Sequence, residues 1–135
     1  MSEIRLIRPQ DLSEQTAQTP GMLRRTAIDG GTVGAKSLWV GVVTVEPGAR
    51  TGAHHHGDCE SVVCVTGGRI RMRFGDGLER SVEAGPGDFV FIPSQLVHQE
   101  VNASDTEAVD SIVIRDSQEN TVIPVDVPDE LLRNG

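Results

Sequence analysis

The sequence predicts an all-β domain, folded as a sandwich or a small barrel, and three observations support this prediction. Short apolar segments rich in β-branched residues recur at intervals of about ten residues, with a turn signal at each break. The 15 glycines and 7 prolines are many for 135 residues, and they are spread along the chain. No segment before the last residues shows the apolar period of an amphipathic helix.

The strand signals are strongest after Lys36. In "RIRMRFGDG", Ile70, Met72 and Phe74 alternate with two arginines, which predicts a strand with one core face and with Arg71 and Arg73 pointing outward. Further strands are predicted in "SLWVGVVTVEPGA", "ESVVCVTGGR", "FVFIPSQ", "LVHQEVNAS", "DSIVIRD" and "TVIPVDV". "MLRRTAI" predicts an edge strand, and "PDELLRNG" a single C-terminal helical turn. This pattern divides the chain into an N-terminal arm (1–36), a barrel core (37–116) and a C-terminal strand and tail (117–135).

Composition limits the possible partners. The formal net charge of −8 argues against binding to nucleic acid or to an anionic membrane, because both need a basic surface. No apolar run approaches the roughly 18 residues of a membrane span, and "MSEIRLIRPQD" has no hydrophobic signal core. We therefore expect a cytoplasmic protein with a small-molecule substrate.

Two cysteines lie five positions apart in one segment, Cys59 and Cys64. Positions five apart on a strand point to opposite faces, so a disulfide between them is not expected. A zinc knuckle would need a second pair of ligands at short spacing. We expect free thiols, with Cys59 facing outward and Cys64, which shares the parity of Glu60, lining the barrel.

The stretch "GARTGAHHHGDCESVVCVTG" holds three of the four histidines. It is internal, which excludes a purification tag. On a strand, His54 and His56 point to one face and His55 to the other. Glu60 follows a bend, and His98 begins another predicted strand, so three imidazoles and one carboxylate could form an open site for a divalent transition metal. A histidine-rich polar turn is the alternative, because H-x-H alone is a weak signal.

Two longer patterns favour the metal site. Residues 48–67 read G-x5-H-x-H-x3-E-x6-G, and residues 87–102 read G-x5-P-x-Q-x2-H-x3-N. They resemble the two signatures of the cupin family, and the chain is similar to small single-domain bacterial RmlC-like cupins. The first pattern matches at every fixed position, whereas the second has Gln95 where the family has glycine.

The resemblance implies a double-stranded β-helix, or jelly-roll, cupin barrel with a short N-terminal strand arm. It maps His54, His56, Glu60 and His98 onto the four metal-ligand positions of the family. It also implies one divalent transition metal ion per chain, which could be Fe, Mn, Ni or Zn, and a homodimer. The alternative is a vestigial site, because many members of the family have lost their ligands.

The favoured function is that of a metal-dependent enzyme acting on a small polar or anionic metabolite. Iron would suit a dioxygenase, an oxidoreductase, whereas zinc, manganese or nickel would suit isomerase or lyase chemistry. Glu100 shares the strand parity of His98, which makes it a candidate catalytic acid or base. Two alternatives stay open: a non-catalytic module that binds a small ligand or a metal, and an accessory cupin of a biosynthetic cluster that works beside a larger synthetase.

Overall fold

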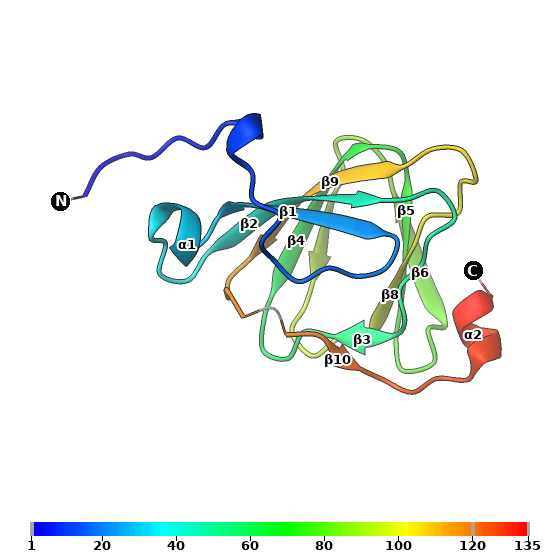
Figure 1. The fold of residues 1–135 in the computed structure, drawn as a ribbon. Coiled ribbons are helices and arrows are strands. Elements are labelled where there is room, and N and C mark those ends of the chain that lie inside the picture. Colours follow the sequence, from blue (N-terminus) through cyan, green and yellow to red (C-terminus); the bar gives the residue numbers. More distant parts are fainter. Residues whose placement is uncertain (1, 120, 135) are drawn as a thin grey trace.

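The protein folds into two antiparallel β-sheets that face each other, as a computed structural model covering residues 2–119 and 121–134 shows (Figure 1). The first 5-stranded sheet has the order β1-β2-β9-β4-β7, and the second the order β10-β3-β8-β5-β6. The first comprises β1 (Met22–Ile28), β2 (Trp39–Val45), β9 (Val109–Arg115), β4 (Ser61–Gly67) and β7 (Phe89–Ile92). The second comprises β10 (Ile123–Pro124), β3 (His54–His55), β8 (His98–Val101), β5 (Ile70–Phe74) and β6 (Arg80–Ala84). The jelly roll that the sequence predicts is confirmed.

Helices are short in the described part of the chain. They are the 3-10 turn η1 (Pro9–Asp11), α1 (Gly30–Val33) and the expected C-terminal turn α2 (Asp129–Arg133). Asp29 caps α1, because its side chain accepts a hydrogen bond from the Thr32 backbone. Among the described residues, no helix has both the length and the apolar character needed to cross a membrane.

The core lies between the two sheets and is built largely from valine. Every second residue of β2 and of β9 is buried, as expected for strands with one face toward the core. Ile70 and Met72 are buried as predicted, whereas Phe74 is half-buried. The apolar cluster also contains Met22, Trp39, Val43, Val45, Val63, Val65, Ala84, Ile92, Val109 and Val113.

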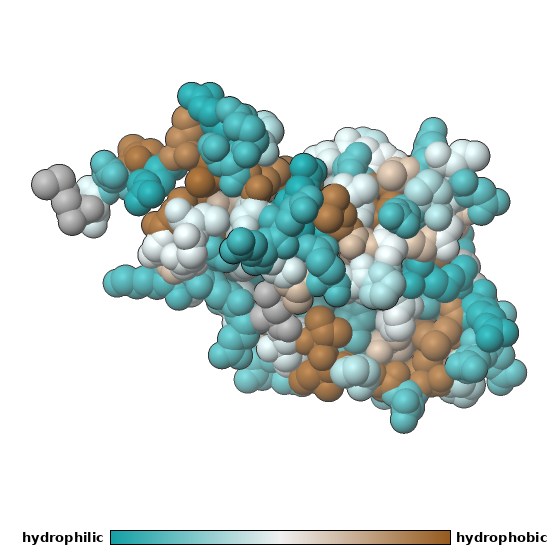
Figure 2. All heavy atoms as spheres, in the orientation of Figure 1, coloured by the Kyte–Doolittle hydropathy of each residue, from teal (hydrophilic) through white to brown (hydrophobic). Residues whose placement is uncertain are grey.

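The segment "MLRRTAI" forms the edge strand that the sequence predicts. This strand, β1, pairs with β2 and so belongs to the first sheet, although it falls within the predicted arm. Residues 2–8 precede η1 and leave the barrel without forming a strand (Figure 1). Within them Ile4 is 100% exposed and Leu6 68% exposed, and the projecting arm shows apolar surface (Figure 2). A homodimer stays a prediction, and it could cover these side chains.

The C-terminal tail packs on the outer face of the second sheet and buries an arginine expected to face solvent. Arg73 is only 6% exposed, and its guanidinium donates hydrogen bonds to the side-chain oxygen of Gln99 at 2.8 Å and to the carbonyl of Leu131 in α2. The Gln99 amide donates in turn to the carbonyl of Leu132 at 3.0 Å. The end of α2 is therefore attached to the barrel by buried polar contacts.

We predict that Arg73→Ala lowers the free energy of unfolding by about 1–3 kcal/mol, because it leaves buried acceptors without a donor. Arg71→Ala is the matched control on the same strand. Arg71 forms a salt bridge with Glu83 at 2.8 Å, but both side chains are partly exposed, so its loss should cost less than about 1 kcal/mol. Urea denaturation of both variants measures the difference, and equal losses would contradict this account of the tail.

Candidate metal centre

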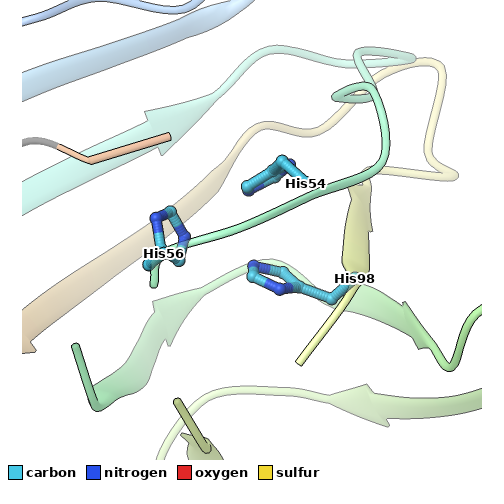
Figure 3. Close-up of side chains that lie close together, drawn as sticks. All are labelled: His54, His56 and His98. Carbon is cyan, nitrogen blue, oxygen red and sulfur yellow. The ribbon is translucent and has the colours of Figure 1, made fainter. Parts of the chain in front are cut away.

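The barrel brings three histidines from distant parts of the chain to one point. His54 in β3 lies directly opposite His98 in β8, and His56 follows β3 by one residue. All three residues are buried, and one ligand nitrogen from each lies within 4.8 Å of the others. Their rings face a common centre (Figure 3). The predicted convergence of these three side chains is therefore present.

Backbone carbonyls fix the orientation of all three rings. In each ring Nδ1 lies within hydrogen-bonding distance of a carbonyl oxygen, which can only accept, so Nδ1 carries the proton when the ring is neutral. Nε2 then presents a lone pair, as a metal ligand must. The Nε2 atom of His98 is buried and has no hydrogen-bond partner among the described residues. The acceptors for His54, His56 and His98 are the carbonyls of Gly52, Thr121 and Leu96, at 2.9, 2.8 and 2.9 Å.

Burial keeps the imidazoles of His54 and His56 uncharged. It lowers the pKa of His56 from 6.5 to about 4, although the hydrogen bond to Thr121 acts in the opposite direction. Burial also lowers the pKa of His54, and the neighbouring His98 adds to this effect. Neutral imidazoles with free Nε2 lone pairs fit a divalent transition metal such as iron, manganese, nickel or zinc. The residues present therefore fit the metal that the sequence implies.

The structure does not bring Glu60 to this centre. Its side chain is exposed and lies outside the group of three ligand atoms. Its backbone N–H donates to the Asp116 carboxylate at 3.1 Å, which holds the residue at the start of β4. This placement does not support Glu60 as the fourth ligand, which stays a prediction that metal analysis can test.

Glu60 is exposed because the alternation of inward and outward side chains does not continue unchanged through the turn between β3 and β4. Gly57 has a left-handed φ of 63°, and the chain reverses there before β4 begins. The buried residues of β4 are Ser61, Val63 and Val65, so its odd-numbered positions point inward. The sequence had predicted that the even-numbered positions, including Glu60 and Cys64, would point inward. The same error affects both cysteines: Cys59 is buried and Cys64 only half-buried, and both are free thiols.

Glu100 lies where the sequence analysis expected a catalytic group. It lines an internal cavity of about 20 Å³ together with His56. Burial acts to raise the pKa of Glu100, but the net direction is downward, because the charged forms of His98 and His54 and the Arg24 guanidinium favour the carboxylate. Near neutral pH, where burial keeps His54 uncharged, the Arg24 guanidinium remains as the positive charge that favours the carboxylate.

Four buried polar residues that line this cavity were not predicted from the sequence. They are Arg24 in β1, Ser61 in β4, and Ser111 and Arg115 in β9. The available signal was strand alternation, since Ser111 and Arg115 alternate in step with the buried valines of β9.

His55 and Gln95 both form hydrogen bonds that stabilise the turn at residues 57–58, which follows the histidines. His55 lies outside the ligand group, and its Nδ1 accepts a hydrogen bond from the Gly57 backbone at 3.1 Å. Gln95, which stands where the family has glycine, keeps the left-handed turn at φ 65°. Its backbone donates to the Gly57 carbonyl at 2.8 Å and its side chain to Asp58 at 2.7 Å. These bonds stabilise a conformation that glycine adopts at lower cost.

Two solved structures of similar shape come from bacteria. The polyketide cyclase RemF from Streptomyces resistomycificus superposes with a TM-score of 0.77 at 22% identity, covering 96% of this chain and 91% of that one. A cupin 2 domain-containing protein from Halorhodospira halophila superposes with a TM-score of 0.69 at 25% identity, covering 84% of this chain and 77% of that one.

Sequence comparison gives a relative and a family. Protein SchB of Streptomyces halstedii is 35% identical over 77 residues, which make up 57% of this chain and 54% of SchB. The chain thus matches about half the length of this relative. Residues 41–114 match the family described as Cupin domain, and this match spans the strands β2 to β9 almost completely. The chain belongs to the cupin domain family.

Proposed function

We propose that the protein is a metal-dependent cupin enzyme that closes a ring in a chain of alternating carbonyl and methylene groups. The observation that carries this proposal is the placement of three buried imidazoles, with Nε2 atoms directed to one centre, beside the carboxylate of Glu100 that lines the cavity. The likeness in fold to a polyketide cyclase over 96% of the chain supports the reaction class. Such a substrate is polar and becomes anionic on enolisation.

We assign metal binding to the three histidines and proton transfer to Glu100. His54, His56 and His98 would hold one divalent metal ion through Nε2. When bound, the ion would supply Lewis-acid polarisation of substrate carbonyl oxygens and so acidify the methylene between them. Glu100 would take the proton from that methylene carbon, which then forms the new bond to a distant carbonyl carbon of the same molecule.

The proton on Glu100 would then pass to the oxygen of the attacked carbonyl, giving an alcohol. Loss of water from this alcohol yields the double bond of the ring. Carbon–carbon bond formation and dehydration need no oxidant and no reductant. This distinguishes ring closure from the dioxygenase chemistry that the sequence also allows, because only the dioxygenase would consume dioxygen.

Metal analysis tests the centre itself. Wild-type protein purified without chelators is expected to carry close to one equivalent of a transition metal per chain, and His98→Ala should lose most of it. His55→Ala is the matched control, because His55 belongs to the same histidine run but lies outside the ligand group. Equal metal content in wild type and His98→Ala would refute the assigned site. Glu60→Gln should keep its metal if the exposed position of Glu60 is correct, whereas loss of metal would restore it as a ligand.

The low pKa of His56 predicts a pH dependence of stability in chelator-treated protein. The histidine takes up a proton near pH 6.5 when unfolded but only near pH 4 when folded. The unfolded state therefore binds more protons between these values, so stability should fall as the pH is lowered from 6.5 to 4. Thermal unfolding of wild type and His56→Gln measures this. The variant should show a shallower fall, and an identical slope would contradict the buried neutral imidazole.

Product analysis tests the reaction. Co-expression with a minimal polyketide synthase that releases a linear poly-β-ketone should yield a ring-closed product with the wild type, including under anaerobic conditions. Glu100→Gln should reduce this yield by about 100-fold or more, as expected for loss of a general base, while keeping its metal. Formation of the same products in the absence of the protein, or a strict need for dioxygen, would refute ring closure as the activity.

A further inference from the structure

The barrel interior holds two buried guanidinium groups in addition to the imidazoles. Arg24 comes from β1 and Arg115 from the end of β9, and they are 7% and 6% exposed. Both line the cavity that His56 and Glu100 also line. Burying a charged group is unfavourable unless it is paired or fully hydrogen-bonded. The presence of two arginines on one small cavity therefore requires an explanation.

The protein supplies incomplete compensation for these charges. Within residues 2–119 and 121–134, no carboxylate oxygen lies within 4.0 Å of either guanidinium. Arg24 donates one hydrogen bond to the Thr19 hydroxyl at 3.0 Å. The Nε atom of Arg115 is buried without a hydrogen-bond partner in the described structure. Arg115 thus has donor capacity that its own chain does not use.

A second polar group lies beside Arg115. Ser61 in β4 is the direct cross-strand partner of Arg115 in β9. Its hydroxyl is buried without an oxygen or nitrogen partner among the described residues, and the Cys59 thiol is its polar neighbour. On the other side of Arg115, Trp39 in β2 is the cross-strand neighbour. The guanidinium carbon lies 5.5 Å from the centroid of the Trp39 ring, a cation–π contact that holds the arginine side chain in the barrel.

The charged groups that line the cavity are two guanidinium groups and one carboxylate, so their net charge is positive. Burial lowers the pKa of Arg115, and the positive charge of Arg24 lowers it further, so the two guanidinium groups repel each other. Glu100 is the acidic residue that lines the cavity and can offset one of the two positive charges. An anion entering the cavity would relieve this repulsion and satisfy the unused donors.

Arg24 also borders a second cavity. This cavity, of about 180 Å³, is lined by His54, Thr51, Val122 and Pro124 as well. Arg24 therefore contributes a positive charge to the lining of both cavities.

We propose that Arg115 and Ser61 form a binding subsite for an anionic oxygen of the substrate, a carboxylate or an enolate, with Arg24 as a second positive group on the same cavity. The proposal rests on the proposed function for the identity of the rest of the substrate. The subsite itself needs no metal, because its donors are a guanidinium and a hydroxyl. It would fix one end of the substrate while the imidazole centre acts on another part.

The test uses full-length, chelator-treated protein and acetate as the probe, with acetamide as the neutral analogue of the same shape. Saturation-transfer NMR titrations should show binding of acetate and not of acetamide. Arg115→Gln should weaken acetate binding by about tenfold or more, as expected for the loss of a charge-assisted hydrogen bond. Ser61→Ala should weaken it by less, and Arg71→Gln, on the outside of the barrel, should leave it unchanged.

Acetate binding that is absent in the wild type, or equal in wild type and Arg115→Gln, would overturn the subsite. If Arg115→Gln does not fold, as judged by circular dichroism, Ser61→Ala decides: unaltered affinity refutes the proposal and weakened affinity supports it. Because the protein carries no metal in this experiment, the result is independent of metal content and of ring closure. A negative acetate titration would refute the subsite without affecting the proposed metal centre. A negative metal analysis would refute the metal centre without affecting the proposed subsite.

Discussion

The candidate centre depends on three hydrogen bonds from imidazole Nδ1 atoms to backbone carbonyls. These bonds direct the Nε2 atoms of all three rings inward. Without them the rings could rotate, and the three Nε2 atoms would no longer point to one centre. For His54 and His98 the acceptor is two residues earlier in the chain. For His56 it is Thr121, which is 65 residues away. The orientation of one imidazole therefore depends on how the C-terminal segment packs on the barrel.

The C-terminal segment reaches this position through the second sheet. In β10, Ile123 pairs with His55, and the Val125 backbone donates to the Ala53 carbonyl at 3.0 Å. Further along, Arg73 and Gln99 attach α2 to the outer face of the same sheet. The tail thus connects the structural arginine on the outside of the barrel with the ring orientation inside it. A loosened tail would remove the acceptor of the His56 ring, whereas the rings of His54 and His98 would keep their local acceptors.

Much of the site could be predicted because strand alternation and the two motifs act over short distances. His54 and His56 share a face, and the register of β3 against β8 adds His98. Alternation gives no guidance across a turn, because it restarts at the first residue of each strand. Glu60 precedes β4 by one residue and is exposed, so the inward position belongs to Ser61. The motif spacing alone could not reveal this shift.

The buried arginines show a second limit of sequence reasoning. Arginine is mostly exposed in proteins, and this expectation outweighed the alternation in β9 that places Arg115 on the buried face. The structure separates two cases. Arg73 faces backbone carbonyls and a glutamine that satisfy it, which makes it part of the fold. Arg115 faces a cavity with an unused donor and a second arginine, so its partner has to come from outside the chain. Hydrogen-bond satisfaction, which no sequence pattern reports, is what distinguishes a structural arginine from one available to a ligand.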